Sequence, residues 1–198
     1  MPTIGFDADQ NCSSVAADAV AAGAGFVCRY LKNMTQAEAR ALSAAGLKIV
    51  SIFESTAKRA LGGAQSGTED GDRALAQASV LGQPQGSAIY ATADFGEKNT
   101  DDAAVMAYFA AFKAALEGQG KLGMYGEGAV CQAALDAGIA DYTWVMGGRL
   151  MRGTQAFIAS GKATLVQDVG DKAGLNLGID IDSDTALSED YGGWSLAA

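Results

Sequence analysis

Acidic residues end several short apolar runs of this 198-residue sequence, and their positions indicate the chemistry that it could perform. Short apolar runs between helical stretches that end in glycine are typical of buried parallel strands. The carboxyl ends of such strands form the face on which an α/β barrel builds its active site. We therefore expect acid–base chemistry or glycan binding in one acidic cleft. The acidic residues placed in this way are Asp7, Glu54, Asp94, Glu127, Asp168, Asp180 and Asp182.

Three of these carboxylates are the candidate catalytic residues. Desolvation against Phe53 would raise the pKa of Glu54, as a general acid requires. Asp94 would assist as a base or as an electrostatic stabiliser. Asp7 would serve as a nucleophile or as a stabiliser of positive charge.

Each of the three also has a purely structural alternative. Asp94 can cap a loop. Asp7 can cap the helix that follows it, although Asn11 and Ser13 are better placed to do so, which favours function for Asp7. Glu54 can instead form a salt bridge, for which the candidate cations are Arg29, Lys58 and Arg59.

The candidate substrate-binding residues lie in or beside the same strands. Aromatic faces stack on sugar rings, and we assign this role to Tyr125 and Trp144, whereas the other strand aromatics are expected in the core. Gln167 is an amide within an apolar strand, so it should hydrogen-bond a carboxylate or a ligand hydroxyl. The remaining substrate-binding candidates are Asp180, Asp182 and Arg29.

Composition excludes several classes of function. The sequence contains no histidine, which removes Ser-His-Asp and Cys-His catalysis and histidine-ligated zinc. Its net charge of −9 disfavours binding to nucleic acid and to anionic membrane surfaces. No apolar run approaches the ~20 residues that span a bilayer.

No metal or cofactor is expected. The segment Asp180-Ile181-Asp182-Ser183-Asp184 is similar to the start of a calcium loop, but Thr185 and Tyr191 stand where glycine and glutamate are required. The glycines near Gly62 and Gly170 lack the lysine and hydroxyl residue of a phosphate-binding loop.

The cysteines and the N-terminus bear on the cellular compartment. Cys12, Cys28 and Cys131 have neither disulfide-framework nor metal spacing, so we expect buried free thiols in a reducing compartment. Met1 leads directly into the first strand without a signal peptide. We therefore expect synthesis in the cytoplasm, with any export by a non-classical route such as phage lysis or a secretion system.

An Ala-rich helix, a glycine stop and an apolar strand recur along the chain. Thr35-Gln36-Ala37-Glu38 is a capping box that opens one of these helices, which should end at Gly46. Repeated strand–helix–strand units imply a parallel sheet. The other expected helices cover residues 13–22, 69–81, about 100–118 and 129–137, and the last apolar strand is expected at Gly178-Ile179.

Eight strands are expected, which is the number that closes an α/β barrel. The segment 154–160 is barely two helical turns long, and a hairpin-length loop separates Gln167 from Gly178. We therefore predict an irregular TIM-type (β/α) barrel whose last three strands are poorly covered by helices, with residues 1–198 as a single domain. An open doubly wound sheet is the alternative.

Seven motifs in sequential order resemble a known family, the glycoside-hydrolase-like barrel domain of unknown function that is related to the family 25 lysozymes. The resemblance covers nearly the whole chain. The motifs are Gly5-Phe6-Asp7, the Glu54 strand, Ile89 to Phe95, Gly123-Met124-Tyr125, Trp144-Val145, Val166-Gln167-Asp168 and Gly178 to Asp182.

The resemblance implies a function and its residues. Family 25 lysozymes cleave the bond between N-acetylmuramic acid and N-acetylglucosamine in peptidoglycan. Their aspartates on the first and last strands are matched by Asp7 and by Asp180 or Asp182. Their Asp-x-Glu pair after the fourth strand is not matched, since Gly96 follows Asp94 at the second position. In the glycoside-hydrolase-like relatives the neighbouring strand, here that of Glu54, supplies the second carboxylate.

Three functions follow in order of preference. The first is a glycosidase acting on bacterial cell-wall peptidoglycan, as a phage or secreted lysin, with Glu54 as proton donor. The second is a glycan-binding module with little or no catalysis, favoured by the missing Asp-x-Glu pair. The third is a cytosolic barrel enzyme acting on an unrelated small molecule.

Overall fold

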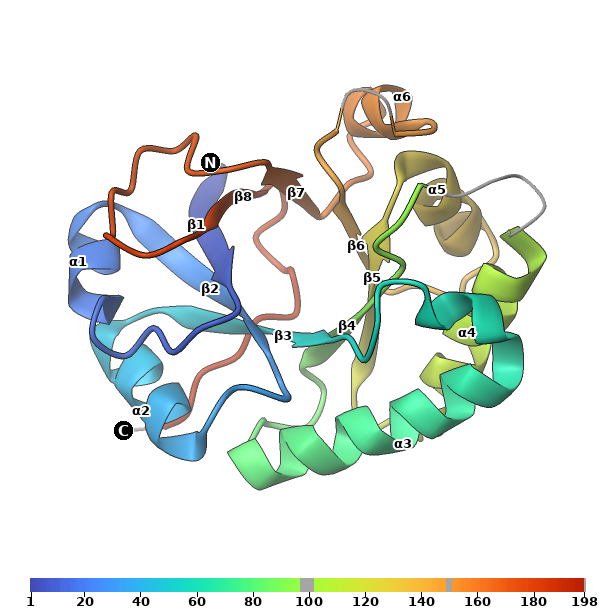
Figure 1. Cartoon of the computed structure of the whole chain (residues 1–198), viewed down its shortest axis with the longest axis horizontal. Helices are drawn as coiled ribbons and strands as arrows, with labels where there is room; N and C mark the ends of the chain where they lie inside the picture. Colours follow the sequence, from blue (N-terminus) through green and yellow to red (C-terminus); the bar gives the residue numbers. More distant parts are fainter. Residues whose placement is uncertain (97–101, 149–150, 198) are drawn as a thin grey trace.

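Eight strands follow one another around a closed barrel, in the order in which they occur in the sequence (Figure 1). The structure, a computed structural model, describes residues 1–96, 102–148 and 151–197. The predicted eight-stranded α/β barrel is confirmed. Its strands are β1 (Thr3–Ala8), β2 (Ala24–Tyr30), β3 (Lys48–Phe53), β4 (Ala88–Thr92), β5 (Lys121–Gly126), β6 (Tyr142–Val145), β7 (Leu165–Asp168) and β8 (Asp182–Ala186).

The last strand runs in the opposite direction to the other seven. β1 to β7 pair in parallel, whereas β8 is antiparallel to both β7 and β1. The expectation of a strand at Gly178-Ile179 is therefore wrong, because residues 169–181 form a loop and β8 begins at Asp182. An antiparallel strand needs no helical crossover, which explains the short connection. Reversal also places Asp182 beside Asp7, its partner in the register.

Helices surround the barrel on most of its circumference. In Figure 1, α1 and α2 lie on one side, α3 runs along the lower edge, and α4 and α5 lie opposite α1 and α2. The cover over the last strands is poor, as predicted: α6 has six residues, and the described loop 169–181 contains no helix. The helices are α1 (Ala16–Ala21), α2 (Gln36–Ala45), α3 (Gly63–Leu81), α4 (Asp102–Ala115), α5 (Gly128–Asp136), α6 (Thr154–Ala159) and a 3-10 turn, η1 (Arg59–Gly62).

Local signals predicted some helix ends well and one badly. The Thr35 hydroxyl accepts the Glu38 backbone N–H at 3.1 Å, and α2 is capped at its end by Gly46 in the left-handed region with φ 101°. In contrast, α3 begins at Gly63 and not at Glu69. Its first turns are held by packing on α4, since a Cβ on Gly67 would lie 2.2 Å from a carbonyl oxygen of α4. The expected helix start at Thr100 and Asp101 lies outside the described residues.

Successive side chains along each strand face opposite sides of the sheet, which produces two apolar layers. One layer fills the barrel interior and includes Phe26, Tyr90 and Trp144. The other lies between barrel and helices and includes Phe6 and Phe109. The three cysteines, Cys12, Cys28 and Cys131, are buried and form no disulfide, as predicted.

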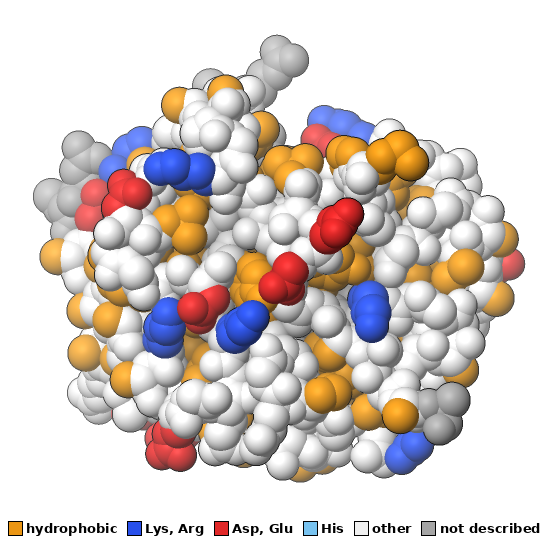
Figure 2. Space-filling model, turned by 180° about the vertical axis from the view of Figure 1, so that it is seen from behind, with side chains coloured by type: hydrophobic (Ala, Val, Ile, Leu, Met, Phe, Trp, Pro, Cys, Tyr) orange, Lys and Arg blue, Asp and Glu red, His pale blue; other side chains and the backbone are white. Residues whose placement is uncertain are grey.

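The outer surface carries mixed charge. On the face opposite to that of Figure 1, acidic and basic side chains alternate among uncharged ones, and exposed hydrophobic residues are scattered (Figure 2). In the part of the chain that the structure describes, no helix is both long and apolar enough to cross a membrane.

Candidate active site

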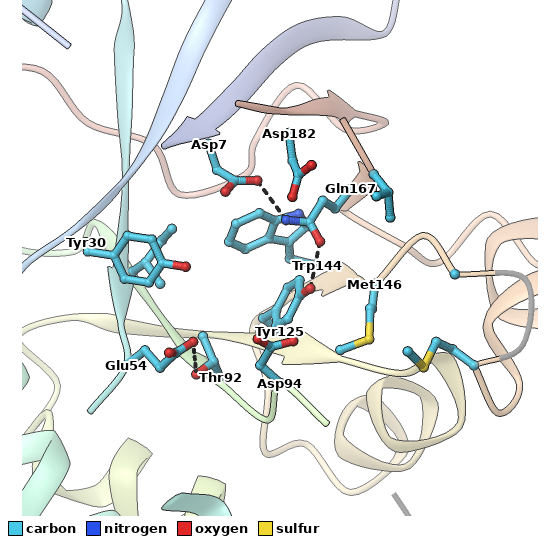
Figure 3. Close-up of a pocket in the computed structure, with 14 residues that line it drawn as sticks. Asp7, Tyr30, Glu54, Thr92, Asp94, Tyr125, Trp144, Met146, Gln167 and Asp182 are labelled. Carbon is cyan, nitrogen blue, oxygen red and sulfur yellow. Dashed lines mark hydrogen bonds between the residues drawn. The ribbon is translucent and has the colours of Figure 1, made fainter. Parts of the chain in front are cut away.

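A cavity of about 320 Å³ opens at the rim where the parallel strands end (Figure 3). The strand residues that line it point to the same side of their strands as the residues that fill the barrel interior. For example, Tyr90 lies in the interior, and Thr92, two residues later on β4, lines the cavity. Leu165 and Gln167 have the same relationship on β7. The inward-facing side chains of each strand are therefore mostly apolar inside the barrel and become polar where the strand reaches the cavity. The polar lining residues are Asp7, Glu54, Thr92, Asp94, Gln167 and Asp182.

Four predicted carboxylates line this one cavity. Figure 3 shows Glu54 and Asp94 on one side and Asp7 and Asp182 on the other. Asp180 is exposed and lies beside a second, adjoining cavity of about 200 Å³, which shares Asp7 and Asp182 with the first. Asp182, the first residue of β8, is therefore the candidate that reaches the main cavity, whereas Asp180 lies in the preceding loop.

The environment of Glu54 favours its protonated form. The side chain is half-buried, and burial raises its pKa, with a further rise from the negative charge of Asp94. The Thr92 hydroxyl donates to Oε2 of Glu54 at 3.2 Å, which acts in the opposite direction. Desolvation likewise raises the pKa of Asp94. This pair of neighbouring carboxylates with raised pKa values matches what a general acid and its partner require.

Asp7 is buried and takes part in a chain of hydrogen bonds across the cavity floor. The Gln167 amide nitrogen donates to Oδ2 of Asp7 at 2.7 Å, and the Tyr125 hydroxyl donates to Oε1 of Gln167 at 2.6 Å. Burial raises the pKa of Asp7 to about 7; the Gln167 bond lowers it and the charge of Asp182 raises it. Gln167 thus bonds a carboxylate, which is one of the two roles expected for it.

Two aromatic residues form the cavity floor. Tyr125 and Trp144 both line it, with ring centroids 4.7 Å apart in an edge-to-face arrangement. Trp144 is only 2% exposed, so little of its ring is open to a stacking ligand. Tyr30 was expected in the core, but it is half-buried and lines both cavities, at the point where they meet. Because it is less buried than Trp144, Tyr30 is better placed for stacking, although the Nζ of Lys32 lies over its ring at 5.2 Å from the centroid.

Sequence reasoning missed Asp184, which is fully buried beside the floor. The Trp144 indole nitrogen donates to its Oδ1 at 2.8 Å. Burial raises its pKa well above the usual range, and the charge of Asp7 adds to this. Asp184 shares a strand face with Asp182, two residues earlier, and this spacing was the available signal.

Arg29 lines neither cavity, although the sequence suggested it as a substrate-binding residue. Arg29 follows Cys28, which faces the barrel interior, so the side chain of Arg29 points toward the helices, where it is fully buried. It pairs with Glu38 at 2.8 Å and also donates to the carbonyl oxygen of Ala8. The proposed salt bridge from Glu54 to Arg29 or Arg59 is likewise not formed, because Arg59 pairs with α3.

The described residues contain no group of three or more histidine, cysteine, aspartate or glutamate side chains that could hold a metal ion. The carboxyl groups that line this cavity can donate a proton, accept a proton and stabilise positive charge.

Residues 18–186 match the family described as "Rv2525c-like, glycoside hydrolase-like domain". The chain belongs to this family. No curated protein sequence matches it.

Solved structures with the same fold include the Tat-secreted protein Rv2525c of Mycobacterium tuberculosis in complex with L-tartrate. It has a TM-score of 0.78 and 24% identity, with 98% of each chain covered. The catalytic domain of endolysin ply40 from bacteriophage P40 of Listeria monocytogenes has a TM-score of 0.61 and 16% identity, covering 96% of this chain and 95% of that one. Both similarities establish the fold.

A third structure with this fold is the modular autolysin LytC from Streptococcus pneumoniae, in complex with a synthetic peptidoglycan ligand. Its TM-score is 0.56 at 10% identity, and the alignment covers 93% of this chain but 46% of LytC.

Proposed function

We propose that this protein is a glycoside hydrolase that acts on bacterial cell-wall glycan, with peptidoglycan as its substrate. The observation that carries the proposal is the pairing of Glu54 with Asp94 in one cavity. Both carboxyl groups have raised pKa values, and Asp7 and Asp182 face them from the opposite side. Two carboxyl groups flanking a bound sugar are the usual requirement for glycoside hydrolysis.

Each residue has a distinct role in this mechanism. Glu54 donates its proton to the glycosidic oxygen as the leaving sugar departs. Asp94 acts as the base or stabilises the positive charge that develops on the sugar ring. Asp7, held by Gln167, and Asp182 bind the sugar and influence the pKa values of the other two carboxyl groups.

The walls of the cavity suit a sugar. Tyr30 stands at the mouth, where its ring can stack on a pyranose face. Met146, Met151 and Val169 provide an apolar wall, while hydroxyl groups of the ligand can reach Gln167 and the carboxylates. This combination of an apolar wall with a few polar groups is typical of ligand sites.

Similar folds support the substrate and the location. One belongs to a phage endolysin, and another to an autolysin bound to a synthetic peptidoglycan ligand. Because Rv2525c is described as Tat-secreted, we also propose that this protein acts outside the cytoplasm.

A second candidate function is a glycan-binding module without catalysis. It is favoured by Gly96, which stands where the family 25 pattern has the second carboxylate. In that case the cavity would bind glycan, and Tyr30 and Tyr125 would contribute more than the proton on Glu54.

The substitution Glu54→Gln separates the two candidates, because it keeps the shape of the side chain and removes its transferable proton. Purified peptidoglycan is incubated with each variant, and new reducing ends are detected by mass spectrometry. Cleavage should fall by roughly 10²–10⁴-fold with binding nearly unchanged. The exposed Glu189→Gln is the matched control. Wild-type protein that binds fragments but releases no reducing ends between about pH 4 and pH 8 would establish the binding module.

A further inference from the structure

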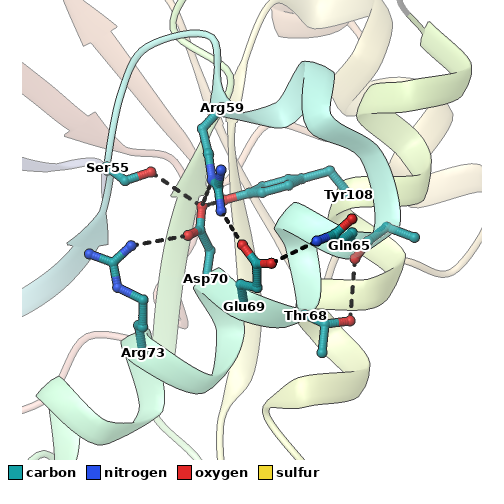
Figure 4. A network of polar contacts seen from close by, with 9 residues as sticks. Ser55, Arg59, Gln65, Thr68, Glu69, Asp70, Arg73 and Tyr108 are labelled. Atoms are coloured by element: carbon teal, nitrogen blue, oxygen red, sulfur yellow. Dashed lines mark hydrogen bonds and ion pairs between the residues drawn. The ribbon is translucent and has the colours of Figure 1, made fainter.

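A buried carboxylate lies behind the loop that carries Glu54. Asp70 belongs to α3 and its side chain is fully buried (Figure 4). Its Oδ2 accepts hydrogen bonds from the Ser55 hydroxyl at 3.3 Å, from Nε of Arg59 at 3.1 Å and from the Tyr108 hydroxyl at 3.1 Å. One carboxylate therefore joins the loop, η1, α3 and α4.

The loop that Asp70 contacts connects both members of the proposed catalytic pair. Glu54 begins it directly after β3, and Ser55 is the next residue. Two residues further on, the carbonyl oxygen of Ala57 accepts the backbone N–H of Asp94 at 3.2 Å. The loop thus carries one carboxylate and holds the backbone of the other.

The frame around Asp70 is rigid. α3 and α4 pack so closely that a Cβ on Gly71 would lie 2.6 Å from the Cβ of Ala115. Tyr108 extends from α4 and is 2% exposed, so its hydroxyl has little freedom to leave Asp70. A contact from this frame to Ser55 therefore fixes the loop relative to the barrel.

Stability alone does not account for such a group. Burying a carboxylate is costly, and replacing a buried ion pair by well-packed apolar residues is often neutral or stabilising. The rest of the α3–α4 contact already uses glycine, alanine and aromatic residues. The distinctive contribution of Asp70 is its bond to the loop.

We propose that Asp70 is a positioning residue for Glu54 and Asp94, which holds loop 54–58 so that both carboxyl groups face the cavity. As a statement about catalysis, this rests on the proposed glycosidase function. A misplacement of about 1 Å can cost 10²-fold in rate, so the effect of the loop on turnover should be large.

Two substitutions test the proposal from opposite ends of one hydrogen bond. Asp70→Asn weakens the whole network, whereas Ser55→Ala removes the link to the loop and leaves the buried carboxylate with its other donors. Glu69→Gln is the matched control, because Glu69 also pairs with Arg59, at 2.6 Å, but its side chain is exposed and its partners are Arg59 and Gln65.

The primary measurement is the titration of the Glu54 side-chain carboxyl by ¹³C NMR. A released loop exposes Glu54 to water and moves it away from Asp94, so its pKa should fall toward the ordinary glutamate value in both variants. It should be unchanged in Glu69→Gln. Folded Asp70→Asn and Ser55→Ala proteins that titrate as wild type would overturn the proposal. If Asp70→Asn does not fold, Ser55→Ala alone decides in the same way.

The second measurement is turnover on peptidoglycan. Both variants should lose roughly 10-fold to 10²-fold in kcat, with KM little changed. Loss of stability with normal kcat and pH profile in the folded protein would overturn the positioning role. If wild-type protein cleaves no glycan, the proposed function fails, and the NMR titration still decides whether Asp70 positions Glu54.

Discussion

Gln167 donates its side-chain amide to Asp7 at 2.7 Å, and this bond joins β7 to β1 across the intervening antiparallel strand β8. The same amide accepts the Tyr125 hydroxyl, so its orientation is fixed from the other side. Asp7 is thereby held in place although burial disfavours its charge. The first prediction concerns this bond.

Replacing Gln167 by methionine should raise the pKa of Asp7 above about 7. Methionine fills a similar volume but donates no hydrogen bond, so the carboxylate stays buried and loses the contact that stabilises its charged form. The ¹³C titration of the Asp7 carboxyl measures the change. Gln132→Met, at a half-buried position of α5 that does not line the cavity, should leave the titration unchanged. A lower pKa of Asp7 in Gln167→Met would contradict the assigned role.

Asp7→Asn should stabilise the fold at neutral pH. The pKa of Asp7 is about 7 in the fold and about 3.9 in an unfolded chain, so the native state binds the extra proton between these values. The contribution of Asp7 to the free energy of unfolding is fully present below about pH 4 and is lost as the pH rises through about 7. Asparagine does not titrate, so the Asp7→Asn protein does not lose this free energy as the pH rises.

Urea denaturation of both proteins at about pH 4.5 and pH 7.5 measures the effect. Relative to wild type, Asp7→Asn should gain up to on the order of 4 kcal/mol in free energy of unfolding at the higher pH. The exposed Asp72→Asn should show no such pH-dependent difference. An equal difference at both pH values would show that Asp7 titrates alike in the folded and unfolded chains.

Gly123→Ala should destabilise the barrel by about 1–3 kcal/mol. A Cβ on Gly123 would lie 2.4 Å from the ring of Tyr90, which is fully buried and bonded through its hydroxyl to the Tyr191 carbonyl oxygen. The ring therefore cannot move aside cheaply. At Gly120 the nearest atom would be 3.4 Å away, so Gly120→Ala is the matched control for urea denaturation. Equal stability of the two variants would refute the packing argument.

The three thiols should react slowly in the native protein and promptly in urea. Burial raises the pKa of Cys12 to about 11, and all three cysteines are buried and outside disulfides. The thiolate fraction of Cys12 at about pH 8 should therefore be roughly 10²-fold smaller than in an unfolded chain. Reaction with a chromogenic disulfide reagent, with and without urea, measures both the rate and the number of thiols. Fewer than three reactive thiols in urea without reductant would indicate a disulfide.

The acidic residues at the rim of the barrel could be predicted from the sequence, because apolar runs mark the strands and the residues that follow them mark the strand ends. Asp7, Glu54 and Asp94 each follow an apolar run, and strands in parallel must end at one edge. The same alternation could have excluded Arg29, which lies one residue after Cys28 and so on the opposite face of β2 from the barrel interior. An apolar run indicates that a strand is present, and the alternation of residues along it indicates which side of the sheet each side chain faces.

β8 could not be predicted from periodicity. Its sequence, Asp-Ser-Asp-Thr-Ala, is too polar to read as a buried strand, whereas Gly178-Ile179 nearby has the expected apolar character. Asp184 is buried because the chain reverses and pairs between β7 and β1, which is a tertiary event. Asp70 was missed for a similar reason: its partners Ser55 and Tyr108 are brought to it by the packing of α3 on α4.

The pairing of β8 with β1 sets the order in which the protein can acquire its cavity. β1 contains residues 3–8, and its second neighbour in the barrel is 182–186, near the other end of the chain. Contacts of such large sequence separation form slowly, and a growing chain folds from its N-terminus before its last strands exist. Asp7 and Asp182 can meet only after residue 182 has left the ribosome. A nascent or truncated chain thus exposes an unpaired edge of β1 and has no acidic cavity, so the site forms together with closure of the barrel.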